Sequence, residues 1–216
     1  MPTHTIVEGD HISRVAREHG FLSIDPIWKH PSNASLVAKR PDPHVLAVGD
    51  SVVVPDFRPR TDEATTQKVH TFVARVQPLF LKLRLFGPGG VLDGVACELA
   101  ADDAPEQLSG DGQGGIERLI QARARRGRVV VHLDEPKVTM AFDFDLVLLI
   151  GHLQPVDTDA GLRSRLCNLG YLLSDDAEDA EALRSAVEEF QCDRGLTVDG
   201  KVGALTRAAL LQTHGS

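Results

Sequence analysis

The chain of 216 residues is poor in aromatic residues, has few cysteines and contains no long apolar run. Trp28 and Tyr171 are the single examples of their kinds, so the aromatic faces on which sugars often stack are scarce. Cys97, Cys167 and Cys192 form no CxxC pair, which argues against a zinc ribbon and favours reduced, buried thiols. Because no apolar stretch reaches membrane-spanning length, we expect no membrane partner.

Basic residues are also in the minority, and the formal net charge is −8. Nucleic acids are held chiefly by Lys and Arg, so we expect no nucleic-acid partner. The basic cluster at residues 123–128 is interpreted as a solvated helix end or loop. The first residues lack the basic region and apolar core of a secretory signal, so we expect synthesis in the cytoplasm without a signal peptide.

The motifs of common enzymes are missing: the sequence has no HExxH, no GxSxG and no P-loop. His132 shares a strand face with Asp134, and Asp143 shares one with Asp145, but both pairs are typical of exposed strand surface. The acidic run at 175–179 lacks the spacing of a calcium-binding loop. We therefore expect no catalytic residue, no metal and no cofactor, and a protein that is not an enzyme.

What the sequence does contain is a change of pattern along its length. Short strand and helix signals come first, then alternating β patterns, then helical spacing, which predicts an α+β protein of several domains. The predicted divisions are a βααβ module at 1–56, a polar linker at 57–68, a small antiparallel β-sandwich at 69–155 and a three-helix bundle at 156–216.

The N-terminal module begins with a short β run at 5–7 and a Gly9-Asp10 turn. Apolar positions from Ile12 recur at helical spacing, a second short helix is predicted at 26–30, and a closing strand at 48–55.

These residues resemble a LysM domain, apart from a lengthened loop from Asn33 to Val45. The resemblance implies a groove for chitin or peptidoglycan formed by Gly9, Asp10, His11 and the region from Asn33 to Leu46.

In the middle of the chain, residues 80–86 alternate between apolar and polar or aromatic positions, and further strands are predicted at 95–99, 128–133 and 139–153. This arrangement resembles the prealbumin-like or carboxypeptidase-regulatory-like sandwich. We interpret it as a spacer.

The C-terminal segment has leucines at helical spacing from Leu162, a Phe190-Gln191 pair and a Gly-Leu-x-Val-Asp-Gly turn at 195–200. It resembles the three-helix peptidoglycan-binding-like domain. That resemblance implies glycan binding, for which Tyr171, Gln191 and Asp199 are the candidate residues.

The whole arrangement resembles proteins associated with the spike of type VI secretion and related contractile injection systems. Two hypotheses follow. The protein is a carbohydrate-binding protein that engages peptidoglycan of the bacterial cell wall through both end modules, delivered to the periplasm by a secretion machine. Alternatively it is an adaptor that grips a secretion spike or effector protein. A hydrolase acting on the wall is the least favoured interpretation.

Overall fold

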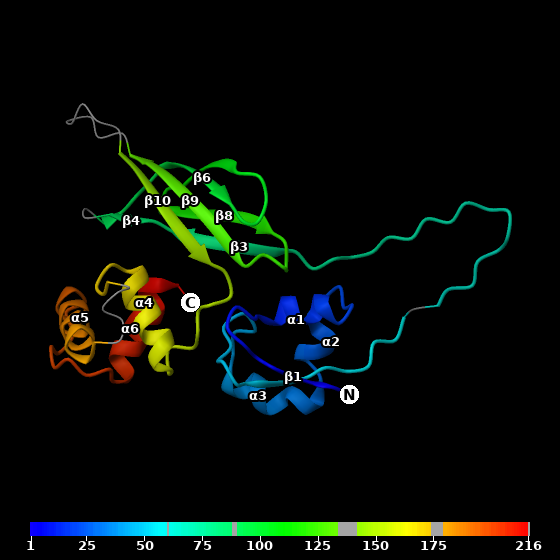
Figure 1. Cartoon of the computed structure of the whole chain (residues 1–216), viewed down its shortest axis with the longest axis horizontal. Coiled ribbons are helices and arrows are strands. Elements are labelled where there is room, and N and C mark those ends of the chain that lie inside the picture. Colours follow the sequence, from blue (N-terminus) through cyan, green and yellow to red (C-terminus); the bar gives the residue numbers. More distant parts are fainter. Residues whose placement is uncertain (60, 88–89, 134–141, 174–178, 216) are drawn as a thin grey trace. The chain divides into compact units, whose positions relative to one another are not determined.

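The computed structural model describes residues 1–59, 61–87, 90–133, 142–173 and 179–215. The expected mixture of helices and small antiparallel sheets is confirmed, with six α-helices among these residues (Figure 1). The chain forms two compact units, one of residues 1–44 and 49–151 and one of residues 45–48 and 152–216. In the described residues, no helix has the length and apolar character needed to cross a membrane.

The N-terminal part is closed by two short strands. β1 (Thr3–Thr5) pairs antiparallel with β2 (Ser51–Val53), and Ile6 donates its N–H to the Asp50 carbonyl at 2.8 Å. The helices between them are α1 (Ile12–Glu18), α2 (Asp25–Trp28), the 3₁₀ helix η1 (Pro31–Asn33) and α3 (Ala34–Lys39).

Helix α3 corrects the prediction that Asn33 to Val45 is a loop. Six of these residues are helical because Leu36 is buried against the module and the helix is followed by Arg40, whose guanidinium is held by Asp50. The core of the module consists of aliphatic side chains that are almost fully buried: Ile6, Ile12, Val15, Ile27 and Val52.

Residues 61–76, which we call the arm, are exposed throughout and project from the module in Figure 1. Both ends of the arm are fixed to the same module. On one side the Phe57 ring packs edge-on against Phe21, with centroids 5.5 Å apart. On the other, Gln77 donates its N–H to the Leu22 carbonyl at 3.0 Å, and its Oε1 accepts the Ile24 N–H at 3.1 Å.

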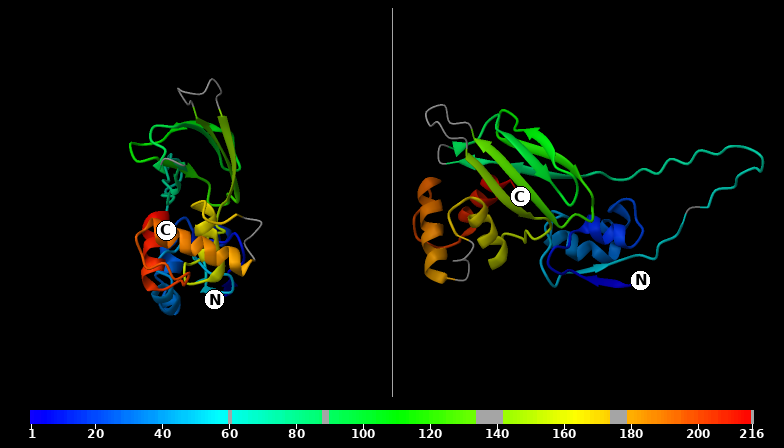
Figure 2. Two further views of the ribbon diagram at one scale, coloured as in Figure 1. Left: turned by 90° about the vertical axis from the view of Figure 1, so that its left-hand side faces the viewer. Right: turned by 45° about the horizontal axis from the view of Figure 1, so that its top comes forward.

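The β region begins at Leu79, ten residues later than the sequence pattern suggested. One sheet has the strand order β10-β9-β6-β7, a second consists of β3 and β8, and β4 and β5 form a small hairpin, all antiparallel. β9 and β10 run side by side in every view (Figure 2). The strands are β3 (Leu79–Arg84), β4 (Phe86–Gly87), β5 (Gly90–Val91), β6 (Ala96–Ala100), β7 (Glu106–Ser109), β8 (Gly115–Ile120), β9 (Arg126–Leu133) and β10 (Phe142–Leu149).

The two larger sheets share one core. Leu81 and Leu83 of β3 pack with Cys97 and Leu99 of β6 and with Val131 of β9. The predicted alternation of β3 is confirmed, since its leucines at 81 and 83 are the more buried positions.

The strand expected at 139–153 is observed as β10, which is the last strand of its sheet. His132, predicted to share a face with Asp134, instead bonds Asp143 across the β9–β10 pair, with Nδ1 and Oδ1 2.7 Å apart. Asp145 is held in the same way by Arg128, at 2.8 and 2.6 Å. Asp134 and the acidic run at 174–178 lie outside the described residues.

The C-terminal part contains α4 (Asp159–Asn168), α5 (Ala180–Asp193) and α6 (Ala204–His214). Thr158 and Asp179 cap α4 and α5 through their side chains, as expected for hydroxyl and carboxylate residues at helix starts. The predicted apolar positions on α4 and α5 form the core, which comprises Leu162, Leu166, Leu172, Ala186, Val187, Phe190 and Leu210.

Two expectations for this part are wrong. Leu205 is 76% exposed and Ala208 is also exposed, because α6 turns Thr206 and Leu210 inward. Cys192 is exposed and Cys167 is only partly buried, so of the three cysteines Cys97 alone fits the expected buried thiol; all three are free.

Candidate functional site

The Gln191 side chain organises the loop that joins α5 to α6. It is 2% exposed, and its amide nitrogen donates to Asp199 Oδ1 and to the Lys201 carbonyl, both at 2.9 Å. Its Oε1 accepts the N–H groups of Asp199 and Gly200, both at 3.0 Å. One buried amide thus substitutes for several backbone partners, and the loop is held in a fixed position on the end of α5.

Asp199 lies in this loop and is exposed. Its Oδ1 also accepts the Lys201 N–H at 2.9 Å. The backbone hydrogen bond from Lys201, followed by the side-chain bond from Gln191, lowers the pKa of Asp199. The carboxylate is therefore ionised at neutral pH and points its remaining acceptor capacity at solvent.

Tyr171 approaches the same end of α5 from the other side. Its ring packs edge-on against Phe190 with centroids 5.4 Å apart, and its hydroxyl donates to Asp193 Oδ2 at 2.9 Å. Arg194 places its guanidinium carbon 5.7 Å from the centre of the Phe190 ring. Burial, and then the bond to Asp193, raise the pKa of Tyr171.

The structure therefore brings Tyr171, Gln191 and Asp199 together around residues 190–193 of α5. The polar side chains exposed there are those of Asp193, Arg194, Asp199 and Lys201, beside Val198, which is 53% exposed. Carboxylates accept hydrogen bonds from sugar hydroxyls and amides, whereas Arg and Lys donate to carboxylates and carbonyls. A polymer that carries hydroxyl, amide and carboxyl groups fits this set.

Comparison with known families agrees with this chemistry. Residues 161–210 match the family described as a putative peptidoglycan binding domain. The C-terminal part of the chain contains a peptidoglycan-binding domain. The match spans about a quarter of the chain, and neither the curated proteins nor the solved structures yield a match to it.

A buried arginine, which the sequence analysis did not single out, supports the peptidoglycan-binding domain from within. Arg165 on α4 is 1% exposed and donates to the carbonyls of Gln154 and Gly161, both at 2.7 Å. His214 has a pKa lowered to about 4 by burial and by the charge of Arg165. A single arginine amid leucines has no periodicity that marks it as buried.

The N-terminal candidates have a different setting from those of the peptidoglycan-binding domain. Gly9 adopts a positive φ of 85° in the turn. Asp10 is 4% exposed, and its Oδ2 lies 2.8 Å from His4 Nε2 and accepts the Val7 N–H at 3.1 Å. The carboxylate holds the turn together, and it does so from inside the module.

His11 is 3% exposed, and within the described residues neither of its ring nitrogens has a hydrogen-bond partner. Its ring faces that of His44, tilted by 52° with centroids 5.9 Å apart. Burial, and then the neighbouring His44, lower the pKa of His11 to about 4. The ring is therefore neutral near pH 7.

Asn33 connects η1 to the second strand. It is 1% exposed, donates from Nδ2 to the carbonyls of Ile27 and Val53, and accepts the Val53 N–H, each at 2.8 Å. Leu46 is also buried. The N-terminal candidates named from the sequence thus hold the module's interior, and contact between their side chains and a glycan would require them to move.

The module also contains a buried ion pair that the sequence did not indicate. Arg40 Nε lies 2.8 Å from Asp50 Oδ2, with the two side chains 5% and 7% exposed. Asp50 belongs to the second Gly-Asp turn, in which Gly49 has a φ of 89°. Both Gly-Asp turns of the module therefore direct their carboxylates inward.

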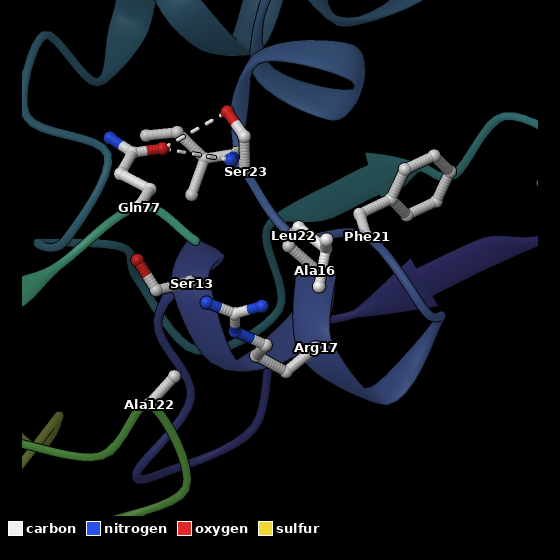
Figure 3. Close-up of a pocket in the computed structure, with 9 residues that line it drawn as sticks. Ser13, Ala16, Arg17, Phe21, Leu22, Ser23, Gln77 and Ala122 are labelled. Atoms are coloured by element: carbon white, nitrogen blue, oxygen red, sulfur yellow. Dashed lines mark hydrogen bonds between the residues drawn. The ribbon is translucent and has the colours of Figure 1, made fainter. Parts of the chain in front are cut away.

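A small hollow beside α1 is the remaining candidate (Figure 3). Ser13, Arg17 and Ser23 line it with Gln77 and Ala122, and the Ser23 hydroxyl donates to Gln77 Oε1 at 3.1 Å. It has space for about one water molecule. That is too small for a sugar ring. Among the described residues, no group of three or more His, Cys, Asp or Glu side chains is placed to hold a metal ion.

Proposed function

We propose that the protein is a non-catalytic binder of peptidoglycan whose main contact is the exposed surface at the end of α5. The observation that carries this proposal is the family match of residues 161–210, supported by the ordered loop that Gln191 fixes. GlcNAc-containing glycan with its peptide stems supplies the hydroxyl, amide and carboxyl groups that Asp199, Lys201 and Arg194 can bind.

The N-terminal module, which resembles LysM in sequence, is proposed as a second and weaker wall contact. Its backbone turns at Gly9 and Gly49 are the parts available to a ligand, because the side chains of Asp10 and Asn33 are buried. Two weak sites on one chain would bind more tightly together than either alone.

Co-sedimentation of the full chain with purified insoluble peptidoglycan tests the proposal. We expect retention in the pellet, with a several-fold loss for Lys201→Glu, whose side chain is exposed and whose backbone alone holds the loop. Lys82→Glu, the same charge change at an exposed position on β3, is the matched control. Equal retention of both variants would contradict the site, and absence of retention would contradict the function.

The proposal that the protein is not an enzyme has its own measurement. After incubation with peptidoglycan, chromatography of the soluble fraction should show no released muropeptides beyond those of a protein-free sample. Release that scales with protein concentration would assign a wall hydrolase.

The second candidate function is an adaptor for a type VI or related contractile injection machine, with a spike or effector protein as partner. One observation favours it: the arm exposes apolar side chains such as Val69 and Phe72 to solvent, as protein-docking segments do. In the producing bacterium, cell fractionation should find the protein in the cytoplasm, and in the periplasm only when the machine is active. Co-purification with a spike or effector protein but not with peptidoglycan would favour the adaptor.

A further inference from the structure

Residues 69–76 of the arm have the composition of a β-strand but no sheet to join. The stretch is rich in valine with one phenylalanine and contains neither proline nor glycine, which is typical of strands. Its large apolar side chains are strongly exposed: Val69 97%, Phe72 71%, Val73 82% and Val76 54%. Exposure of this much apolar surface is unfavourable by about 25 cal/mol per Å², so a partner that covers it is stabilised.

β10 is a strand edge with the complementary deficiency. It pairs with β9 on one side, and among the described residues no strand pairs with its other side. Protein edges of this kind are usually protected by charged side chains. The two charges of β10, Asp143 and Asp145, are engaged by His132 and Arg128 of β9. The apolar side chains beside them remain about half exposed or more, namely Phe144 53%, Leu146 45%, Val147 71% and Leu149 54%.

The two segments match in length and in pattern. Residues 69–76 and the eight residues of β10 can align antiparallel with Phe72 opposite Leu146. Phe72 and Ala74 then lie on the same sheet face as Leu146 and Phe144. That is the core face, because Leu146 and Phe144 are opposite the buried Val129 and Val131.

The same register places charges favourably. Arg75 lies opposite Asp143, and Val69 lies opposite Leu149. Residues 68–76 contain two bases and no acid, whereas β10 contains two acids and no base. A shift of one residue would move Phe72 to the opposite face, so the pattern selects this register.

We propose that a second copy of the chain supplies the missing strand: residues 69–76 of each copy add antiparallel to β10 of the other, in a two-fold symmetric dimer. In a single chain both segments are without a strand partner, and the arm is fixed at both ends to its own module by Phe57 and Gln77. Strand addition to a free edge is an established mode of protein association. About sixteen residues of each copy take part, close to the roughly 20 to 30 per side of a standard interface.

This interface goes beyond wall binding and does not depend on it, although a dimer would present two peptidoglycan-binding domains to one surface. Its first test is the mass of the full chain in solution without ligand, by sedimentation equilibrium. We expect a dimer at micromolar concentration and at least a tenfold weaker association for Phe72→Asp. Thr66→Asp, in the same arm but outside the pairing stretch, is the matched control. Both positions are exposed, so neither variant should unfold the protein.

Disulfide trapping tests the register. In a Cys192→Ser background, Thr71→Cys with Val147→Cys places two cysteines directly opposite each other, where β-carbon atoms are about 4.5–5.5 Å apart. We expect a disulfide-linked species of twice the chain mass, and much less of it with Thr66→Cys and Val147→Cys or with either cysteine alone. A monomeric chain overturns the proposal, as does a cross-link within one chain, which would show that the arm pairs with its own β10. A dimer that Phe72→Asp leaves intact overturns it equally.

Discussion

The two ends of the chain use Gly and Asp turn residues in opposite ways. In the N-terminal module the carboxylates of Asp10 and Asp50 point inward, where they meet His4 and Arg40. In the peptidoglycan-binding domain, Asp199 is exposed and its loop is fixed by a neutral buried amide, that of Gln191. An aspartate in a turn therefore indicates the turn alone; whether it is free for a ligand depends on which residue satisfies the loop from below.

The largest effect is expected from Asp50→Ala. Removing a carboxylate from the buried Arg40 guanidinium should destabilise the N-terminal module by about 3–5 kcal/mol. Hydrogen exchange should show loss of protection in residues 1–55, with retention on peptidoglycan through the C-terminal domain preserved. Asp56→Ala is the control, because Asp56 is 71% exposed. Loss of retention in Asp50→Ala would assign the main wall contact to the N-terminal module.

The corresponding change at the other end is Gln191→Leu. It leaves the N–H groups of Asp199 and Gly200 without their acceptor, which should cost about 3 kcal/mol in the free energy of unfolding. Thermal unfolding and co-sedimentation should both change, since the 196–203 loop would lose its anchor. Gln212→Leu, on the exposed side of α6, should alter neither. If Gln191→Leu unfolds at the wild-type temperature, the loop is held by something other than this amide.

Acid should destabilise the N-terminal module through His11. Its unfolded side chain binds a proton near pH 6.5, whereas the folded one does so only at about 4. The unfolded state therefore binds more protons below pH 6.5, and stability is complete above that pH and falls toward pH 4. Between pH 7.5 and 5 the loss should be about 2 kcal/mol.

Hydrogen exchange resolved to residues 1–55 measures this loss apart from that of the C-terminal domain, where His214 behaves similarly. His11→Leu should reduce the pH dependence, and His70→Gln in the exposed arm should not. A stability that is constant from pH 7.5 to 5 would show that His11 becomes accessible to water.

The smallest effect is expected from Tyr171→Phe. The hydroxyl gives up one hydrogen bond to Asp193, so stability should fall by at most about 1 kcal/mol. The ring still packs on Phe190, and retention on peptidoglycan should change less than twofold. A tenfold loss of retention would show that the hydroxyl itself contacts the glycan.

The sequence predicted the helices of the C-terminal domain well, because Leu162, Leu166, Val187 and Phe190 repeat at helical spacing and all face one core. It failed at Leu205, where the inward position is taken by Thr206, which lies 3.2 Å from the Gln191 amide nitrogen. A polar network can thus rotate a helix against its apolar pattern.

In the N-terminal module, α3 was not predicted because a six-residue helix has too few apolar positions for a period, and Leu36 is its single buried residue. The candidate binding residues there could be named as turn and loop residues but not placed. Burial of Asp10, His11 and Asn33 depends on contacts with residues distant in the sequence, such as Val53, which local pattern does not contain. The same limit applies to β10, whose alternation was evident but whose edge position was not.

The fixed ends of the arm separate two lengths that a flexible connection would combine. Since Phe57 and Gln77 both hold to the N-terminal module, the distance available between that module and the first strand is governed by the short step from Gln77 to Leu79. Residues inserted within 61–68 would extend the outward reach of the loop and leave that step unchanged. Doubling the loop would cost only about 0.6 kcal/mol in closure entropy, so its projection can be tuned without redesign of the body that carries it.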